Sequence, residues 1–224
     1  SIEVAEFTKL YENVFRSVNI ALANKTKILA NKLKIDINEV INAASTKPFG
    51  FTRFEPGPGV GGHCIPIDPF YLSWIAEKKN VKLNLTKSAA KINFSITDWI
   101  VKKIENYSKN FLKTKKPKIF IIGAAYKKNL NDLRMSPTLF IIKKLKKKFK
   151  IKYNDEYIKK IKTKMFKEVY RSFPITKKNL QDSDLTLIMT DHDYLNKNII
   201  LKNSRIIFDT RNFFKTNNIK VKKL

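Results

Sequence analysis

The glycines of this chain are concentrated in one short stretch. Four of the six glycines lie between positions 57 and 62, within the sequence Gly-Pro-Gly-Val-Gly-Gly-His-Cys-Ile-Pro-Ile-Asp-Pro of residues 57–69. Because glycine tolerates positive φ and lets a ligand approach the backbone closely, this density predicts a shaped loop rather than an ordinary turn. The last two residues predict a helix start, with Asp68 as N-cap and Pro69 as the first helical residue.

The only cysteine, Cys64, directly follows these glycines. Most lone cysteines are small buried core residues, and Asp68 could serve simply as a helix cap. The neighbouring helix start favours a reactive thiol instead, because the N-terminal end of a helix stabilises negative charge. We therefore expect an ionisable thiol on a glycine loop, with a buried cysteine as the alternative.

The N-terminal half of the chain has helical periodicity. Residues 5–31 are expected to form one helix in which Lys9 and Asn13, four residues apart, share a face beside the apolar stripe. A second helix is expected to begin at Asp36, where Asp36 and Glu39 have capping-box spacing. The apolar stripe of the first helix consists of Phe7, Leu10, Val14, Val18, Ala21 and Leu22.

A third helix is expected from Pro69 to about residue 79, and a long fourth helix is expected to end near residue 111. From Lys118 onward, short apolar strands alternate with helices, the first of which opens at Ser136-Pro137. Such alternation implies a parallel sheet with helices on both faces, which binds ligands at the carboxyl ends of its strands. The expected strands cover residues 118–123, 151–153, 184–190 and 205–209. We therefore predict an α/β protein with a helical domain over 1–116 and a sheet domain over 117–224.

Composition limits the class of protein. Hydrophobic residues make up 43% of the 224 residues, which is typical of a globular chain. The single cysteine excludes an internal disulfide and favours a reducing, cytoplasmic setting, and no apolar run is long enough to span a bilayer. The net charge of +27 would suit nucleic-acid binding, but the lysines are spread along the chain, so we expect no nucleic-acid partner.

Two further absences bear on cofactors. With two histidines and one cysteine, the sequence offers no zinc-ligand set, and we expect no metal. No Gly-x-Gly-x-x-Gly follows a predicted strand, so the usual dinucleotide-binding fingerprint is missing.

Three motifs together resemble the nucleotide-sugar 6-dehydrogenases, the family of UDP-glucose and UDP-N-acetylhexosamine dehydrogenases. The first is the cysteine loop, which, with residues 44–50, is most similar to the UDP-N-acetylglucosamine branch. The others are residues 123–137, similar to the family's nucleotide-sugar loop, and residues 208–212. Two positions depart from the family pattern, because Lys25 and Met135 each occupy a position at which relatives usually have Glu.

The resemblance implies a role for each candidate residue. Cys64 is the nucleophile, Lys9 and Asn13 stabilise the developing oxyanion, and Asp68 orients or deprotonates a water. Arg134 corresponds to a residue that reaches NAD. The substrate-binding set is Arg53, Gly57, Gly59, Gly61, Tyr126, Lys127 and Arg211.

The implied fold is a helical central, dimerisation domain followed by a Rossmann-like UDP-binding domain. The implied reaction is NAD-dependent oxidation of the C6 alcohol of a UDP-N-acetylhexosamine, expected to be UDP-N-acetylglucosamine, to the uronic acid. We expect the chain to be a fragment without the N-terminal NAD-binding domain, inactive alone, and a homodimer or higher homo-oligomer. The alternatives are a UDP-glucose or UDP-N-acetylmannosamine dehydrogenase fragment and a non-catalytic nucleotide-sugar-binding module.

Overall fold

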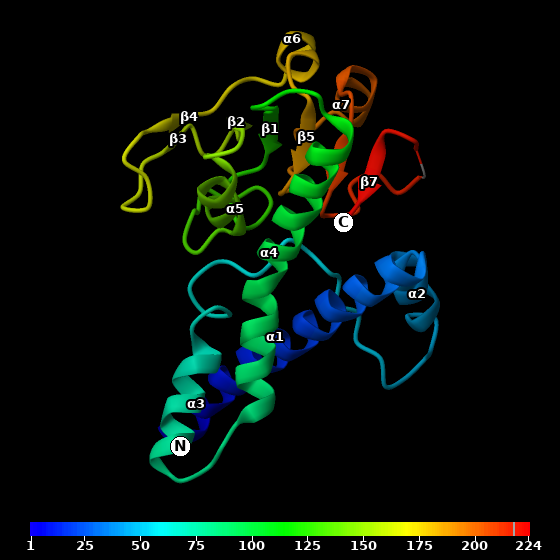
Figure 1. Cartoon of the computed structure of the whole chain (residues 1–224). Coiled ribbons are helices and arrows are strands. Elements are labelled where there is room, and N and C mark those ends of the chain that lie inside the picture. Colours follow the sequence, from blue (N-terminus) through cyan, green and yellow to red (C-terminus); the bar gives the residue numbers. More distant parts are fainter. Residues whose placement is uncertain (217) are drawn as a thin grey trace. The chain divides into compact units, whose positions relative to one another are not determined.

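The computed structural model of the chain describes residues 1–216 and 218–224. It forms two compact units, residues 1–96 and 97–224 (Figure 1). The division between the two compact units lies inside helix α4 (Asn84–Phe111). Its physical reason is that Ile100 and Ile104, in the second half of α4, are part of the hydrophobic core of the sheet.

The first unit contains three helices and the start of α4. Helix α1 (Ile2–Leu33) is longer than expected at both ends, and it stops where Lys34 adopts a left-handed conformation. Helix α2 (Ile37–Ala44) begins as predicted at Asp36, whose carboxylate accepts the N–H of Asn38 rather than that of Glu39. Helix α3 covers Asp68–Lys78.

The buried face of α1 is not the apolar stripe that the sequence predicted. Phe7 and Leu22, two members of that stripe, are 57% and 62% exposed. Asn13, Ser17 and Asn24 are instead buried, each at 1% exposure or less. Ala21 is the member of the stripe that is fully buried. This helix buries its small and polar residues and presents large apolar ones outward.

The second unit is built on a five-stranded sheet whose paired strands are all parallel, in the order β2-β1-β5-β6-β7. This confirms the predicted parallel sheet, and each of the four expected strands is present. The sheet consists of β1 (Lys118–Ile122), β2 (Lys150–Asn154), β5 (Leu185–Ile188), β6 (Ile207–Asp209) and β7 (Val221–Lys223).

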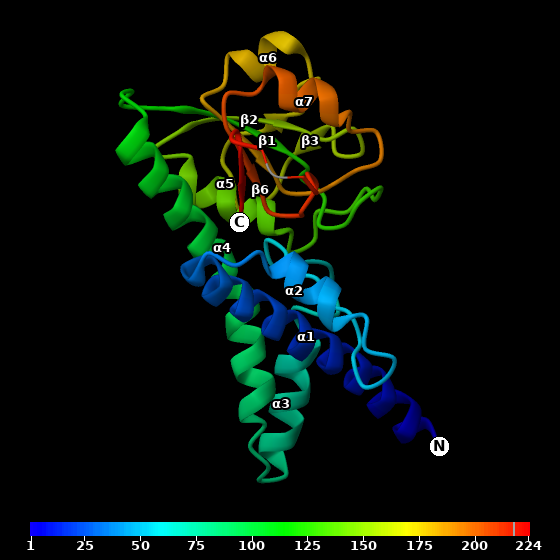
Figure 2. The ribbon, with the colours of Figure 1, turned by 90° about the vertical axis from the view of Figure 1, so that its right-hand side faces the viewer.

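Alternate residues of β1 belong to the two hydrophobic cores that lie on opposite faces of this sheet. Ile119 and Ile121 pack with α5 (Pro137–Leu145) and the second half of α4. Phe120 and Ile122 pack with α6 (Lys177–Gln181) and α7 (Lys197–Asn203) on the other face (Figure 2). Residues 119–122 of the strand are therefore all apolar and buried, as expected for a sheet covered on both sides.

Several elements were not predicted. Strand β7 extends the sheet, and β3 (Lys160–Ile161) pairs antiparallel with β4 (Tyr170–Arg171) in a separate two-stranded sheet. The predicted start of α5 is confirmed, because Ser136 is its N-cap and accepts the N–H of Thr138. Among the described helices, none is both long and apolar enough to cross a lipid bilayer.

Candidate functional site

The cysteine loop leads directly into helix α3. Gly59 and Gly62 have φ values of 128° and 86°, which residues with a Cβ rarely adopt. The carbonyl of Cys64 accepts the N–H of Asp68 at 2.8 Å, so Cys64 lies one helical turn before the first residue of α3. The side chain of Cys64 is exposed, which excludes the alternative of a buried core cysteine.

Asp68 does not cap α3, which corrects our prediction. Ile67 occupies the N-cap position, Asp68 is the first helical residue, and Pro69 is the second. The carboxylate of Asp68 instead accepts a hydrogen bond from Nδ2 of Asn13 at 2.6 Å. Arg16 donates to Oδ1 of Asn13, which fixes the amide with its NH₂ group toward Asp68. The structure therefore brings together two residues that are 55 positions apart in the sequence.

A buried amide ladder holds the start of the glycine loop, and the sequence motifs gave no sign of it. Asn24 accepts the N–H of Gly57 at 2.9 Å and donates to Asn93, which in turn donates to the carbonyl of Ser17. All three side chains are buried. The signal in the sequence was the helical spacing of Asn13, Ser17 and Asn24, which share one face of α1.

Two other expected residues lie at the surface of this unit. Lys9 is exposed and pairs with Glu12 at 3.6 Å. Arg53 donates to Glu55 at 2.8 Å and to Asn42 at 2.9 Å, which ties it to α2. In the described part of the chain, no hydrogen bond or ion pair joins Lys9 or Arg53 to Cys64 or Asp68.

In the second unit, the loop after β1 passes close against the end of β5. A Cβ on Gly123 would lie 2.4 Å from Cβ of Thr190 and 2.5 Å from its backbone nitrogen, so only glycine fits there. Thr190 also donates to the carbonyl of Ala125 at 2.6 Å. The start of this loop is therefore fixed by the neighbouring strand.

A carboxylate occupies the position at which a dinucleotide fold would bind phosphate. Asp155, directly after β2, accepts the N–H groups of Ala124 and Ala125 at 2.7 and 2.9 Å. It also accepts from His192 at 3.1 Å, and both side chains are buried. Burial opposes the charge of Asp155, but these hydrogen bonds outweigh it and hold the pKa of Asp155 below its usual range. Sequence analysis missed both residues.

Arg211 connects three strand ends. It follows β6, donates to the carbonyl of Met189 after β5 at 2.9 Å, and reaches the carbonyl of Tyr126 after β1 at 3.3 Å. Two of the expected substrate residues, Tyr126 and Arg211, are thus brought together. Both residues lie just beyond the carboxyl ends of parallel strands, β1 and β6.

The two other basic residues of this loop are exposed. Lys127 lies between Tyr126 and a pair of anchored residues, and among the described residues no hydrogen bond or ion pair of its ammonium group is found. Arg134 is bound to the carboxylate of Asp132 at 2.6 Å, and its guanidinium holds the pKa of Asp132 below the usual range.

The described residues do not provide a dinucleotide cradle. The N–H groups of Ala124 and Ala125 are already taken by Asp155, and the turn lacks the glycine pattern that lets a pyrophosphate approach. Within residues 1–216 and 218–224, no group of three His, Cys, Asp or Glu side chains could hold a metal ion.

Comparison with known protein families gives two matches. The UDP-glucose/GDP-mannose dehydrogenase family matches with its central domain over residues 3–95 and with its UDP binding domain over residues 120–216. Both matches come from one family, and they follow the same order as the two units of the structure.

Individual proteins support the same relationship. The UDP-N-acetyl-D-mannosamine dehydrogenase of Methanocaldococcus jannaschii is 35% identical over 94% of this chain and 47% of its own length. Protein CapL of Staphylococcus aureus is 33% identical over 99% of this chain and 53% of its own length. The chain thus spans about half the length of the curated relatives it matches.

Solved structures show the same fold. The UDP-D-ManNAc dehydrogenase of Pyrococcus horikoshii superimposes with a TM-score of 0.82 at 30% identity, covering 97% of this chain and 50% of that one. The UDP-N-acetyl-mannosamine dehydrogenase Cap5O of Staphylococcus aureus gives a TM-score of 0.76 at 29% identity, with 97% and 50% covered.

Proposed function

Because the chain belongs to the UDP-glucose/GDP-mannose dehydrogenase family, we propose that it forms the central and UDP-binding parts of an NAD-dependent nucleotide-sugar 6-dehydrogenase. The hydrogen bond between Asn13 and Asp68 is the observation that carries this proposal. It joins two residues to which the resemblance gives catalytic roles, and it lies one helical turn from the exposed Cys64.

The residues of the first unit suit covalent capture of an aldehyde. The Cys64 thiolate adds to the C6 aldehyde of the sugar, and the resulting thiohemiacetal carries an oxygen whose charge Asn13 and Lys9 would stabilise. Loss of a hydride from that carbon gives a thioester. A water positioned by Asp68 then attacks the thioester carbonyl, releasing the carboxylate and restoring the thiol.

The two hydrides need an acceptor, which the resemblance identifies as NAD. The described residues do not form its binding fold, so NAD must be held by residues outside this set, with Arg134 as the one expected contribution. We therefore assign the capture and hydrolysis steps to this chain and expect that the chain alone produces no NADH.

The second unit would bind the nucleotide part of the substrate. Lys127 and Arg211 supply positive charge at the carboxyl ends of parallel strands, where ligands of α/β folds bind. Tyr126 is held between them by the Arg211 contact with its carbonyl. The family description of this region as a UDP binding domain supports the same role.

We propose a UDP-N-acetylhexosamine as the substrate. The sequence motifs favoured the glucosamine epimer, whereas three of the four proteins named above are mannosamine dehydrogenases, which favours UDP-N-acetylmannosamine. Turnover of the two epimers side by side separates these possibilities.

The test is a chimera that joins residues 1–224 to the part of the Methanocaldococcus jannaschii relative outside the matched region. We expect this chimera to convert the UDP-sugar to its acid and to form NADH. Cys64→Ser should abolish acid formation without weakening UDP binding, because a serine hydroxyl is a far poorer nucleophile than a thiolate. His63→Gln, in the same exposed loop, is the matched control and should retain turnover.

Two results would contradict this assignment. Acid formation at an unchanged rate by the Cys64→Ser chimera would remove Cys64 as the nucleophile. UDP binding without any acid formation by the unsubstituted chimera would favour the non-catalytic nucleotide-sugar-binding module instead.

We also propose that two copies of the chain associate through α1. Large apolar side chains recur at steps of three, four or seven residues on the face of α1 opposite its buried residues. Such a stripe can pair with its own copy about a two-fold axis. The stripe consists of Val4, Phe7, Tyr11, Phe15, Leu22, Leu29 and Leu33.

Sedimentation analysis tests this association. Tyr11→Glu places a charge within the stripe and should convert a dimer to monomer, whereas Thr114→Glu adds the same charge at an exposed residue outside α1 and should not. A monomeric unsubstituted chain at micromolar concentration would exclude α1 as a self-association surface.

A further inference from the structure

We propose that His192 is a positioning residue for the loop of residues 126–135 and that it acts through Nδ1, which accepts the backbone N–H of Asn129. The loop is the one that carries Lys127, so the consequence for ligand binding rests on the proposed function. The arrangement of the loop itself does not.

The contacts of His192 determine which ring nitrogen carries the proton. The ring is buried, Nδ1 lies 3.0 Å from the backbone nitrogen of Asn129, and Nε2 lies 3.1 Å from Oδ2 of Asp155. A backbone N–H can only donate and an ionised carboxylate can only accept. The ring is therefore neutral, with its proton on Nε2 and a lone pair on Nδ1 facing the loop.

The anchored part of the loop lies directly after Lys127. Asn129 has a φ of 57°, a conformation that must be held by its surroundings. Its side chain donates to Asp193 and accepts the backbone N–H of that residue at 3.1 Å, and Lys128 pairs with the same carboxylate. On the other side of Lys127, Arg211 holds the carbonyl of Tyr126.

Lys127 thus projects from a short span with an anchor at each end. His192 supplies the buried anchor, while the contacts of Asp193 lie at the surface, where water competes with them. The Asp155 carboxylate fixes the tautomer of His192 and also binds the N–H groups of Ala124 and Ala125, directly before the same loop. A single buried pair therefore holds the loop at its beginning and at Asn129.

A proton on Nδ1 would reverse this arrangement. Two donors would then face each other, and the N–H of Asn129 would lose its buried acceptor. The rings of Tyr157 and Tyr194 pack on the imidazole with centroids 5.2 Å away, which leaves the ring no room to turn over. The titratable or charged groups around His192 are Asp155 and Tyr157 after β2, Lys128 after β1, and Asp193 and Tyr194 from its own segment.

Two amide substitutions separate the functions of the two nitrogens. His192→Asn places a carbonyl oxygen near the position of Nδ1 and keeps an acceptor for Asn129, but it loses Asp155. His192→Gln reaches the position of Nε2 and keeps a donor for Asp155, but it leaves the N–H of Asn129 without an acceptor. The readout is the hydrogen-exchange rate of the Asn129 amide, measured by NMR on the 224-residue chain.

We expect the Asn129 amide to exchange about 10-fold faster or more in His192→Gln, the change that follows from losing one buried hydrogen bond. His192→Asn should stay close to the unsubstituted chain. The affinity for UDP should follow the same order. If His192 acted only through its contact with Asp155, the Asn129 amide would exchange faster in His192→Asn than in His192→Gln, because His192→Asn is the variant that removes that contact.

Equal exchange of the Asn129 amide in both variants would overturn the inference. A chain that shows these exchange effects but binds no UDP would refute the proposed function alone.

Discussion

At the scale of single residues, buried polar side chains hold the cysteine loop in place. Asn13, Asn24 and Asn93 form hydrogen bonds across three segments of the first unit, and each of them is nearly inaccessible to water. If one partner of a buried amide is removed, the amide keeps the cost of desolvation without the hydrogen bond that offset it, and the fold becomes less stable. The position of the loop is therefore sensitive to changes of single polar atoms.

Substitution of Asp68 tests this sensitivity. Asp68→Ala leaves Nδ2 of the buried Asn13 without an acceptor and should lower the free energy of unfolding of the first unit by about 1–3 kcal/mol. Asp68→Asn keeps an oxygen at that position and should cost less than about 1 kcal/mol. Urea unfolding followed by the fluorescence of Trp74 measures the effect, in a Trp99→Phe background that removes the signal of the second unit. An equal decrease in the free energy of unfolding for both variants would contradict this role of the Asn13–Asp68 hydrogen bond.

At the scale of elements, the closest approach in the sheet unit is between the ends of β1 and β5. The backbone at Gly123 has a φ of 93° and lies against backbone atoms of Thr190, which cannot move aside like the end of a flexible side chain. The loop that carries Tyr126 begins at the end of β1, and Arg211, which follows β6, donates to the carbonyl of Met189 at the end of β5. The spacing of the strands at this edge therefore decides where the basic residues lie.

Gly123→Ala should accordingly destabilise the second unit by about 3 kcal/mol or more, because a steric clash adds to the strain of positive φ. Gly50→Ala is a matched control, since Gly50 has a φ of 74° but no atom within 4 Å of the position that an added methyl group would take. It should cost only about 1–2 kcal/mol, the strain alone. Trp99 reports the second unit and Trp74 the first. Similar costs at both glycines would show that the contact with Thr190 is relaxed in solution.

The order of strands and helices could be predicted from the sequence, while several contacts could not. Apolar runs such as residues 119–122 predict buried strands because every residue of such a run faces a covered side. The apolar stripe of α1 could be identified from the sequence, but its contacts could not, because periodicity shows which residues share a face and not what that face contacts. Strand β7 was missed, since Val221–Lys223 is too short and too rich in lysine to have a pattern.

The features of the candidate site were also predictable only in part. The strand pattern predicted a parallel sheet, and Tyr126 and Arg211 lie where such a sheet binds ligands, at the carboxyl ends of its strands. The pairing of Asn13 with Asp68 and that of Asp155 with His192 depend on how distant segments pack, and no local spacing encodes them. Asp68 was assigned to the N-cap because aspartate is common at that position and proline is common at the first helical position that follows it.

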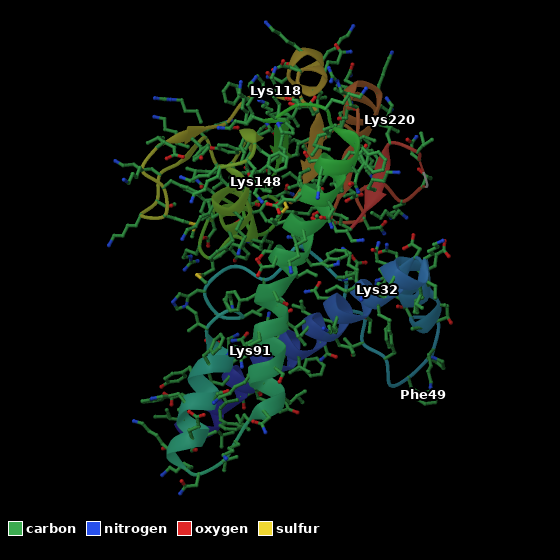
Figure 3. The ribbon with its side chains drawn as sticks, viewed as in Figure 1. Lys32, Phe49, Lys91, Lys118, Lys148 and Lys220 are labelled. Atoms are coloured by element: carbon green, nitrogen blue, oxygen red, sulfur yellow. The ribbon has the colours of Figure 1, made fainter. Side chains whose placement is uncertain are left out.

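At the scale of the whole molecule, the dominant property is positive charge. The chain has 46 basic and 19 acidic residues. Even if every acidic side chain paired with a different basic one, 27 basic side chains would remain in excess. Figure 3 shows lysine side chains extending outward from both units. The labelled examples are Lys32, Lys91, Lys118, Lys148 and Lys220. Such an excess of one sign destabilises a compact fold through self-repulsion.

We therefore expect salt to stabilise this chain. Between about 0.01 and 0.15 M NaCl the screening length falls from about 30 Å to about 8 Å, which weakens the repulsion between distant lysines. The few exposed ion pairs that salt also weakens contribute little stability. The midpoint of thermal unfolding should rise by several degrees over this range, as measured by circular dichroism.

A charge series at one exposed lysine separates repulsion from other effects of salt. Lys147→Gln and Lys147→Glu lower the net charge by one and two units at a residue that lies on the exposed side of the segment after α5. Each should raise the unfolding midpoint at low salt, Glu more than Gln, and each should reduce its dependence on salt in the same order. A midpoint that falls as salt is added would mean that ion pairs, and not repulsion between lysines, dominate the electrostatic free energy of this fold.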